Sequence, residues 1–192
     1  MTSFDRQSRR GFLKSVAAAA GTAAASRELA AFEAETPFLI IDCHAHIYGE
    51  DEAKYPTIDQ PYRPPEGKGT ISHLREEMKA NGVRYVTAVQ TSTFYRWDNR
   101  FTTDSSRDHA DFMVGICTLD PDDKKSPGLL EEFVKHKNVR GMRSIPGKDG
   151  KLDAPGVDAL WATAERLGIV INVLANRPQR PEIEALIGRH PR

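Results

Sequence analysis

Apolar, strand-like segments alternate with amphipathic, helix-like segments along most of this sequence, and this alternation limits the possible folds more than any other feature. Strands are predicted at residues 39–43, 84–90, 112–118, 139–143 and 169–174, and helices at 71–81, 129–136, 157–167 and 181–189, with a further short helix within 98–111. Gly82 and Gly168 stand where the end of a helix favours a positive φ. The alternation predicts an α/β protein with a parallel sheet flanked by helices.

Two architectures share this alternation, an open doubly wound sheet and a (β/α)8 barrel. The first predicted strand runs into His44 and His46, and no Gly-x-Gly-x-x-Gly turn follows it. Polar residues at the ends of several strands favour the barrel. A complete barrel takes about 250 residues, whereas residues 37–192 provide about five βα units. We therefore predict a partial (β/α)8 TIM barrel over 37–192, truncated at its C-terminal side where a sixth strand is expected.

The charge balance excludes two large classes of partner. The sequence has 27 basic and 27 acidic residues and a formal net charge of zero. Such a chain generates no field that attracts nucleic acid or an anionic membrane. We expect a small-molecule substrate, no nucleic acid, and possible homo-oligomers.

The two cysteines, Cys43 and Cys117, are too few for a disulfide framework. On the first and third strands of a parallel sheet they would lie about 9 to 10 Å apart, which is beyond the reach of a disulfide. We predict two buried free thiols. Alternation along the strand is expected to turn Cys43 away from His44 and His46.

The first 36 residues are predicted to be an export signal and linker. Residues 8–14, Ser-Arg-Arg-Gly-Phe-Leu-Lys, match the twin-arginine motif, and residues 16–25 form a short, Ala-rich apolar run. A membrane anchor is the weaker interpretation, because this run is well below the roughly 20 residues needed to span a bilayer. We therefore expect export by the twin-arginine route to the periplasm or beyond, with no membrane contact except through the signal peptide.

A His-x-His pair stands where the first strand ends. Side chains two residues apart share one face of a strand, so Asp42, His44 and His46 are expected to point together. Two imidazoles that converge at the end of a buried parallel strand suit a divalent metal, with Zn²⁺ or Mn²⁺ as the expected ion. Two other interpretations stay open: the histidines orient a substrate carbonyl without a metal, or they are hydrogen-bonded structural residues.

Three further polar residues at strand ends are candidates for substrate binding. Gln90 ends the second predicted strand and can hydrogen-bond a substrate oxygen or cap the strand. Arg143 ends the fourth, where a guanidinium can bind a substrate carboxylate in a bidentate manner or pair with an Asp of the long loop after the first strand. Asn172 lies near the end of the fifth and can bind a substrate hydroxyl or act as an ordinary turn residue at the start of a loop. Catalytic residues are not assigned.

The sequence resembles the amidohydrolase-related family 2 of metal-dependent TIM-barrel hydrolases. The segments that carry this resemblance are residues 41–46, 55–56, 78–83, 89–90, 139–143 and 167–169, in the same order across five units. Within the family, the chain is most similar to the sugar-lactone and pyrone-dicarboxylate lactonase branch, because residues 171–178 carry Asn172 and no histidine. The resemblance implies a metal that activates water, with a metal-free site as the alternative in this branch.

The resemblance also implies which ligands the chain does not supply. Many family members place a third metal ligand on the fifth strand, where Leu174 stands here. Their histidine on the sixth strand and their general-base aspartate on the eighth would lie beyond Arg192. We expect a hydrolase that opens a cyclic ester. The alternatives are a carboxy-lyase of the same family, and an inactive truncated product or non-catalytic binding protein.

Overall fold

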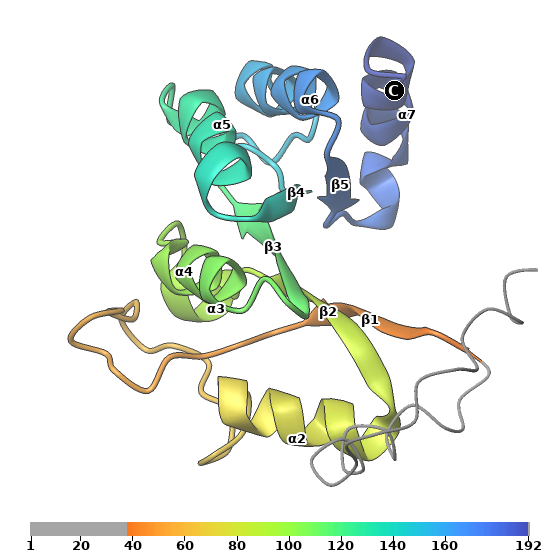
Figure 1. Ribbon diagram of the computed structural model, residues 1–192. Helices are drawn as coiled ribbons and strands as arrows, with labels where there is room; N and C mark the ends of the chain where they lie inside the picture. The colour runs from red at the N-terminus through yellow and green to blue at the C-terminus, as the bar shows by residue number, and fades with distance from the viewer. Residues whose placement is uncertain (1–37, 192) are drawn as a thin grey trace, which may run out of the picture. The chain divides into compact units, whose positions relative to one another are not determined.

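The structure is a computed structural model and describes residues 38–191 (Figure 1); the predicted signal peptide lies outside them. Its elements in chain order are β1 (Ile40–Ala45), α2 (Ile71–Asn81), β2 (Val83–Val89), α3 (Ser92–Tyr95), α4 (Arg100–Asp108), β3 (Met113–Thr118), α5 (Ser126–His136), β4 (Val139–Ser144), α6 (Pro155–Leu167), β5 (Val170–Val173), the 3-10 turn η2 (Arg177–Gln179) and α7 (Arg180–Arg189). Among these residues no helix is long and apolar enough to cross a membrane.

The five strands pair in parallel in the same order as in the chain, β1-β2-β3-β4-β5. A doubly wound sheet reverses its strand order at a switch point, and this sheet has no reversal. The strands instead follow one another around a curled sheet with helices between them (Figure 1). The prediction of a partial (β/α)8 barrel with about five units is confirmed.

Local sequence signals set the helix ends. Thr70 caps α2, because its hydroxyl accepts the backbone N–H of His73 at 3.1 Å. The same helix ends at Gly82 with φ of 65°, and α6 ends at Gly168, also with φ of 65°. Both glycines therefore take the left-handed conformation that the sequence predicts for them.

The apolar core lies between the sheet and the helices. One cluster packs Val86, Ala88 and Met113 of the first strands against Met78 of α2. A larger cluster packs β3 and β4 against α5, α6 and α7, and its buried members are Cys117, Leu119, Leu130, Val139, Met142, Leu152, Val157, Leu160, Trp161, Ala164 and Leu186. The helices thus cover the outer face of the sheet, and the alternate residues of each strand face the inside of the curl.

The prediction that both cysteines are buried is wrong for Cys43. Cys117 is buried in the outer core, and burial raises the pKa of its thiol to about 12, whereas Cys43 is exposed. The register between β1 and β2 shifts between Asp42 and Ala45, so β1 has one extra residue there and strict alternation does not hold across Cys43. Within the described residues β1 is also an edge strand, and Ile40 and Ile41 beside Cys43 are exposed as well.

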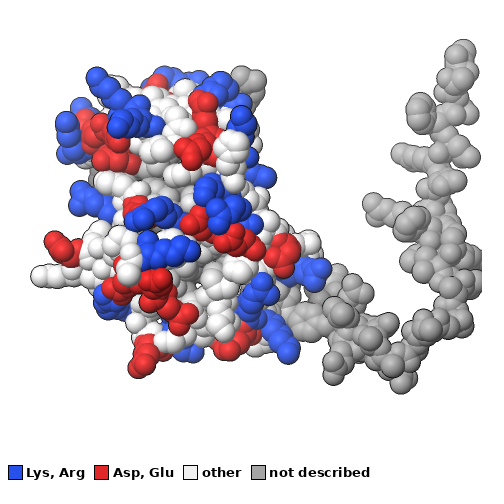
Figure 2. All heavy atoms as spheres, turned by 60° about the vertical axis from the view of Figure 1, so that its left-hand side comes forward, with Lys and Arg blue, Asp and Glu red and all other residues white. Residues whose placement is uncertain are grey.

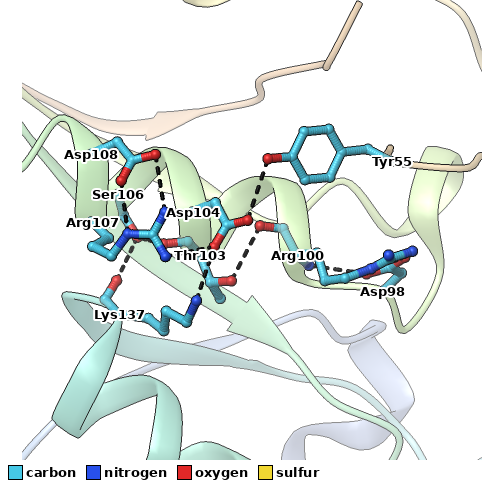
Figure 3. Close-up of polar contacts among 9 residues, drawn as sticks. All are labelled: Tyr55, Asp98, Arg100, Thr103, Asp104, Ser106, Arg107, Asp108 and Lys137. Carbon is cyan, nitrogen blue, oxygen red and sulfur yellow. Dashed lines mark hydrogen bonds and ion pairs between the residues drawn. The ribbon is translucent and has the colours of Figure 1, made fainter. Parts of the chain in front are cut away.

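The long loop that follows β1, residues 47–69, is fixed to α3 and α4 by aromatic rings. Tyr48 packs edge-on against Phe94 with ring centroids 5.0 Å apart, and Tyr55 packs against Phe101 at 5.1 Å. The Tyr55 hydroxyl also donates to Asp104 at 3.3 Å, which accepts from Lys137 at 2.9 Å (Figure 3). This polar cluster joins the loop, α4 and the residue that directly follows α5.

Charged side chains of both signs are interspersed over the surface. On the face drawn in Figure 2, lysines and arginines alternate with aspartates and glutamates, and neither sign gathers into one patch. This distribution matches the zero net charge of the sequence. Field-driven binding of a polyanion therefore has no support on this face.

Candidate functional site

The strand ends bring His44, His46 and Arg143 together on the inner side of the sheet. His44 lies near the end of β1 and His46 directly after it, and their rings are almost perpendicular with centroids 5.0 Å apart. Arg143 lies on β4, and its Nη2 donates to His44 Nε2 at 2.8 Å. Three of the five residues that the sequence singles out therefore form one group, although they come from strands 99 residues apart.

The hydrogen bonds of His46 set its tautomer. Its Nδ1 lies 2.8 Å from the carbonyl oxygen of Val89, which can only accept, so Nδ1 carries the proton. The other ring nitrogen, Nε2, is left with a lone pair. Burial lowers the pKa of His46, although the bond to Val89 opposes this, and Arg143 and His44 lower it further. With Nδ1 committed to Val89, the Nε2 atom of His46 can accept a proton or bind a cation.

Arg143 sets the state of His44. A guanidinium only donates, so His44 Nε2 is the acceptor and its lone pair is already used. The backbone N–H of His44 donates to Asp42 Oδ1 at 2.9 Å, which holds the end of β1 in place. His44 is thus oriented by a carboxylate on its backbone side and by a cation on its ring.

Arg143 is a partly buried cation that has no anionic partner in the described part of the chain. No carboxylate among residues 38–191 lies within ion-pair distance of its guanidinium, and burial lowers its pKa. Arg100 and Arg107, which are more exposed, each pair with aspartates. The predicted structural alternative, an ion pair between Arg143 and an Asp of the long loop, is therefore not formed.

Asn172 lies on the same inner face as Arg143. The two residues are direct partners in the parallel register of β4 and β5, and paired residues of neighbouring strands point to the same side. Within the described part of the chain, the side-chain amide of Asn172 has no hydrogen-bond partner. It is therefore placed to contact a ligand bound by Arg143, and this role stays a prediction.

Gln90 lies apart from this group. Its side chain is buried, its Nε2 donates to the carbonyl oxygens of Asp98 (2.8 Å) and Arg96 (3.3 Å), and its Oε1 accepts from Thr102 at 3.0 Å. These bonds tie the end of β2 to α4 and use both ends of the amide. The geometry fits the strand-cap alternative, and substrate binding by Gln90 stays a prediction that requires these bonds to break.

Thr118 belongs with the inner group, although sequence reasoning missed it. Thr118 ends β3 and is the register partner of Arg143. Its position at a strand end was the available signal. A threonine near the end of a β-strand is so common that the residue type alone carries no information.

The donor set does not fit a divalent ion in this arrangement. Among residues 38–191, no group of three or more His, Cys, Asp or Glu side chains is assembled around a common point. His46 is oriented as metal-binding histidines commonly are, because its Nδ1 donates to a backbone carbonyl and its Nε2 stays available. The lone pair of His44 is used by a guanidinium whose charge repels a cation. Metal binding by His44 and His46 stays a prediction that requires Arg143 to move.

The amidohydrolase family profile matches residues 41–192. The chain belongs to the amidohydrolase family. The match covers both histidines, Arg143, strands β2 to β5 and all of β1 except Ile40. No curated protein sequence matches the chain significantly.

Solved structures similar to this amidohydrolase chain are TIM-barrel proteins of bacteria. A probable 2-pyrone-4,6-dicarboxylic acid hydrolase of Acinetobacter baumannii, solved with citric acid bound, has 16% identity and a TM-score of 0.63 over 80% of this chain and 55% of its own. An amidohydrolase of Burkholderia multivorans with bound zinc has 23% identity and a TM-score of 0.54, covering 80% and 55%. A 5-carboxyvanillate decarboxylase of Novosphingobium aromaticivorans, complexed with manganese, has 15% identity and a TM-score of 0.53, covering 78% and 55%.

These likenesses show the fold. The chain spans little more than half the length of each of the three structures. Two of the three contain zinc or manganese, so divalent metals occur among proteins of this fold.

Proposed function

We propose that this chain is an amidohydrolase-superfamily hydrolase that opens a cyclic ester carrying a carboxylate group. The observation that supports this proposal is the state of Arg143. Its guanidinium is partly buried, has no anion among the described residues, and is bonded to a neutral imidazole at the end of β1. A partly desolvated guanidinium that lacks a carboxylate of its own is suited to bind one from a ligand.

The surrounding residues have separate roles in this proposal. Arg143 binds the substrate carboxylate in a bidentate manner and so releases the ring of His44. His46, whose Nδ1 is bonded to the Val89 carbonyl, accepts a proton at Nε2 from the attacking water. The water oxygen bonds to the ester carbonyl carbon, the bond from that carbon to the ring oxygen breaks, and the ring oxygen takes up the proton. The product is the ring-opened acid.

A carboxy-lyase is the second candidate. The likeness to the 5-carboxyvanillate decarboxylase supports it at the level of the fold, and a carboxylate held at Arg143 is compatible with either reaction. The products separate the two candidates. A hydrolase yields a ring-opened acid, whereas a carboxy-lyase yields carbon dioxide. A non-catalytic binding protein yields neither and still binds the carboxylate.

The test uses 2-pyrone-4,6-dicarboxylate and an uncharged pyrone that lacks both carboxylates. We expect ring opening of the dicarboxylate, followed by proton NMR, and little reaction of the uncharged compound. Arg143→Gln should lower kcat/KM for the dicarboxylate by about 10- to 100-fold, because it removes a charge-assisted bidentate contact. Assays with a chelator and with added Zn²⁺ separate metal-assisted hydrolysis from hydrolysis by side chains alone.

The matched control is Arg140→Gln, which lies on the same strand and donates to the carbonyl oxygens of Val134 and Val139. This variant should keep the parent kcat/KM. Carbon dioxide as the product would replace the hydrolase by the carboxy-lyase. Equal activity of Arg143→Gln and the parent chain would overturn the assignment of the carboxylate site.

A further inference from the structure

The end of β3 is held rigidly from its backbone. Asn99 is buried, and its Oδ1 accepts the backbone N–H of Thr118 while its Nδ2 donates to the Thr118 carbonyl, both at 2.9 Å. Both backbone groups of Thr118 are therefore satisfied by a single amide. The position of the Thr118 side chain is set by this clamp and by the strand.

The side chain of Thr118 is fully buried, with 0% exposure, and its hydroxyl has no hydrogen-bond partner among the described residues. It is the one such buried side-chain oxygen or nitrogen in residues 38–191. Buried hydroxyls are nearly always paired, because a desolvated hydroxyl without a partner is costly. An exception beside a candidate site indicates a group that pairs with a ligand.

Thr118 shares its face with Arg143. The two residues are direct register partners on β3 and β4, and neighbouring strands lie about 4.8 Å apart. Their neighbours along the strands, Cys117 and Met142, belong to the core on the outer face, so Thr118 and Arg143 face the inside. Within the described residues, an unpaired hydroxyl and a guanidinium without an anion therefore occupy neighbouring positions at the ends of two strands.

We propose that Thr118 is a substrate-binding residue whose hydroxyl donates to the same carboxylate that Arg143 binds. This inference rests on the proposed function and adds a residue and a preference to it. A carboxylate has four lone-pair positions and accepts a bidentate guanidinium together with a hydroxyl. A neutral ester or primary amide at this position lacks one charged oxygen, so Thr118 favours lactones that carry a free carboxylate.

The test compares Thr118→Val with Thr118→Ser in the full chain. Valine keeps the volume and removes the hydroxyl, whereas serine keeps the hydroxyl. Citrate is the binding probe, measured by calorimetry, and 2-pyrone-4,6-dicarboxylate is the kinetic probe. We expect Thr118→Val to raise the Kd for citrate and the KM by about 5- to 20-fold with little change in kcat, as for the loss of one hydrogen bond to a charged group. Thr118→Ser should stay within about threefold of the parent.

The control is Thr163→Val, because Thr163 is also buried but donates to Ala159 within α6 at 2.9 Å. It should leave the Kd and KM unchanged. If Thr118→Val does not fold, Thr118→Ala, which introduces no new bulk, gives the same comparison. Two results would overturn the role of Thr118 and leave the proposed function standing. One is a parent-like Kd and KM in the variant without the hydroxyl, and the other is an equal rise of Kd and KM in Thr118→Ser and Thr118→Val. A parent chain that neither binds citrate nor opens the lactone would overturn the proposed function itself.

Discussion

Met142 and Arg143 are neighbours on β4, and they occupy opposite faces of the sheet. Met142 is 1% exposed and packs in the core formed with α5, α6 and α7. Arg143 faces the inside, is partly exposed, and is bonded to a histidine of β1. The same contrast separates Cys117 from Thr118 one strand away, since the thiol lies in the outer core and the hydroxyl has no hydrogen-bond partner among the residues that the structure describes.

The contrast shows that one sheet serves two purposes on its two sides. Apolar burial on the outer face supplies the free energy of folding. The inner face holds a desolvated cation and an unpaired hydroxyl, and each of these groups costs free energy of folding until a ligand binds. Substitutions on the two faces should therefore affect stability and binding separately.

The largest expected effect comes from the outer face. Met142→Ala should lower the free energy of unfolding by about 2 to 5 kcal/mol, because it leaves a cavity in a close-packed core. Arg143→Gln, one residue along, should leave the free energy of unfolding unchanged or slightly raise it, since it removes a partly buried charge that pairs with no anion within residues 38–191. Urea unfolding of both variants and the parent measures the difference.

Equal destabilisation by the two substitutions would contradict the separation of the faces. A refinement comes from α5, where Leu130 is fully buried and Leu129 is exposed. Leu130→Ala should behave like Met142→Ala, and Leu129→Ala like the parent.

The sequence predicted the face of the sheet that carries polar residues better than it predicted the exact set of residues. Carboxyl ends of parallel strands meet at one edge, and this rule placed His44, His46 and Arg143 in one group. It failed where the backbone departs from strict alternation. The register shift between Asp42 and Ala45 changed the environment of Cys43, which is exposed.

Two other residues show that a position at a strand end does not predict the hydrogen-bond partners of the side chain. Gln90 directly follows β2, one residue past the end of the strand, and its amide bonds to Thr102 and to two carbonyl groups beside α4. Thr118 was missed because an unpaired hydroxyl can be identified only when every neighbouring donor and acceptor is known. The sequence gives the position of a strand end, whereas the use of a polar group there depends on contacts between distant segments.

The second prediction concerns the pH dependence of the inner face. Burial lowers the pKa of His46 below its ordinary value of 6.5 in the folded chain, so the unfolded chain binds the proton more tightly. The contribution of His46 to stability is therefore complete above pH 6.5 and is lost as the pH falls from there through the lowered pKa. We expect His46→Asn, which keeps a donor for Val89, to show a smaller loss of stability between pH 7.5 and pH 5 than the parent.

Urea midpoints across this pH range provide the measurement. His136→Asn, a substitution of an exposed histidine in the last turn of α5, serves as the control and should keep the parent's pH dependence. An unchanged pH slope in His46→Asn would show that the imidazole is not desolvated on the inner face.

The smallest expected effect lies away from both faces, in the polar cluster around Asp104 (Figure 3). Asp104 accepts from Arg107 at 3.1 Å, Lys137 at 2.9 Å and Tyr55 at 3.3 Å. These contacts are partly exposed, so Asp104→Asn should lower the free energy of unfolding by only about 0.5 to 1 kcal/mol at low salt. The loss should shrink at high salt, because screening weakens the ion pairs of the parent. Asp153→Asn, at an exposed position with no ion pair among the described residues, should change stability by less. Asp104 joins the loop after β1 to α4 and to the end of α5. A loss above about 2 kcal/mol would therefore show that this cluster contributes as much as a core residue, and that stability is not concentrated on the outer face.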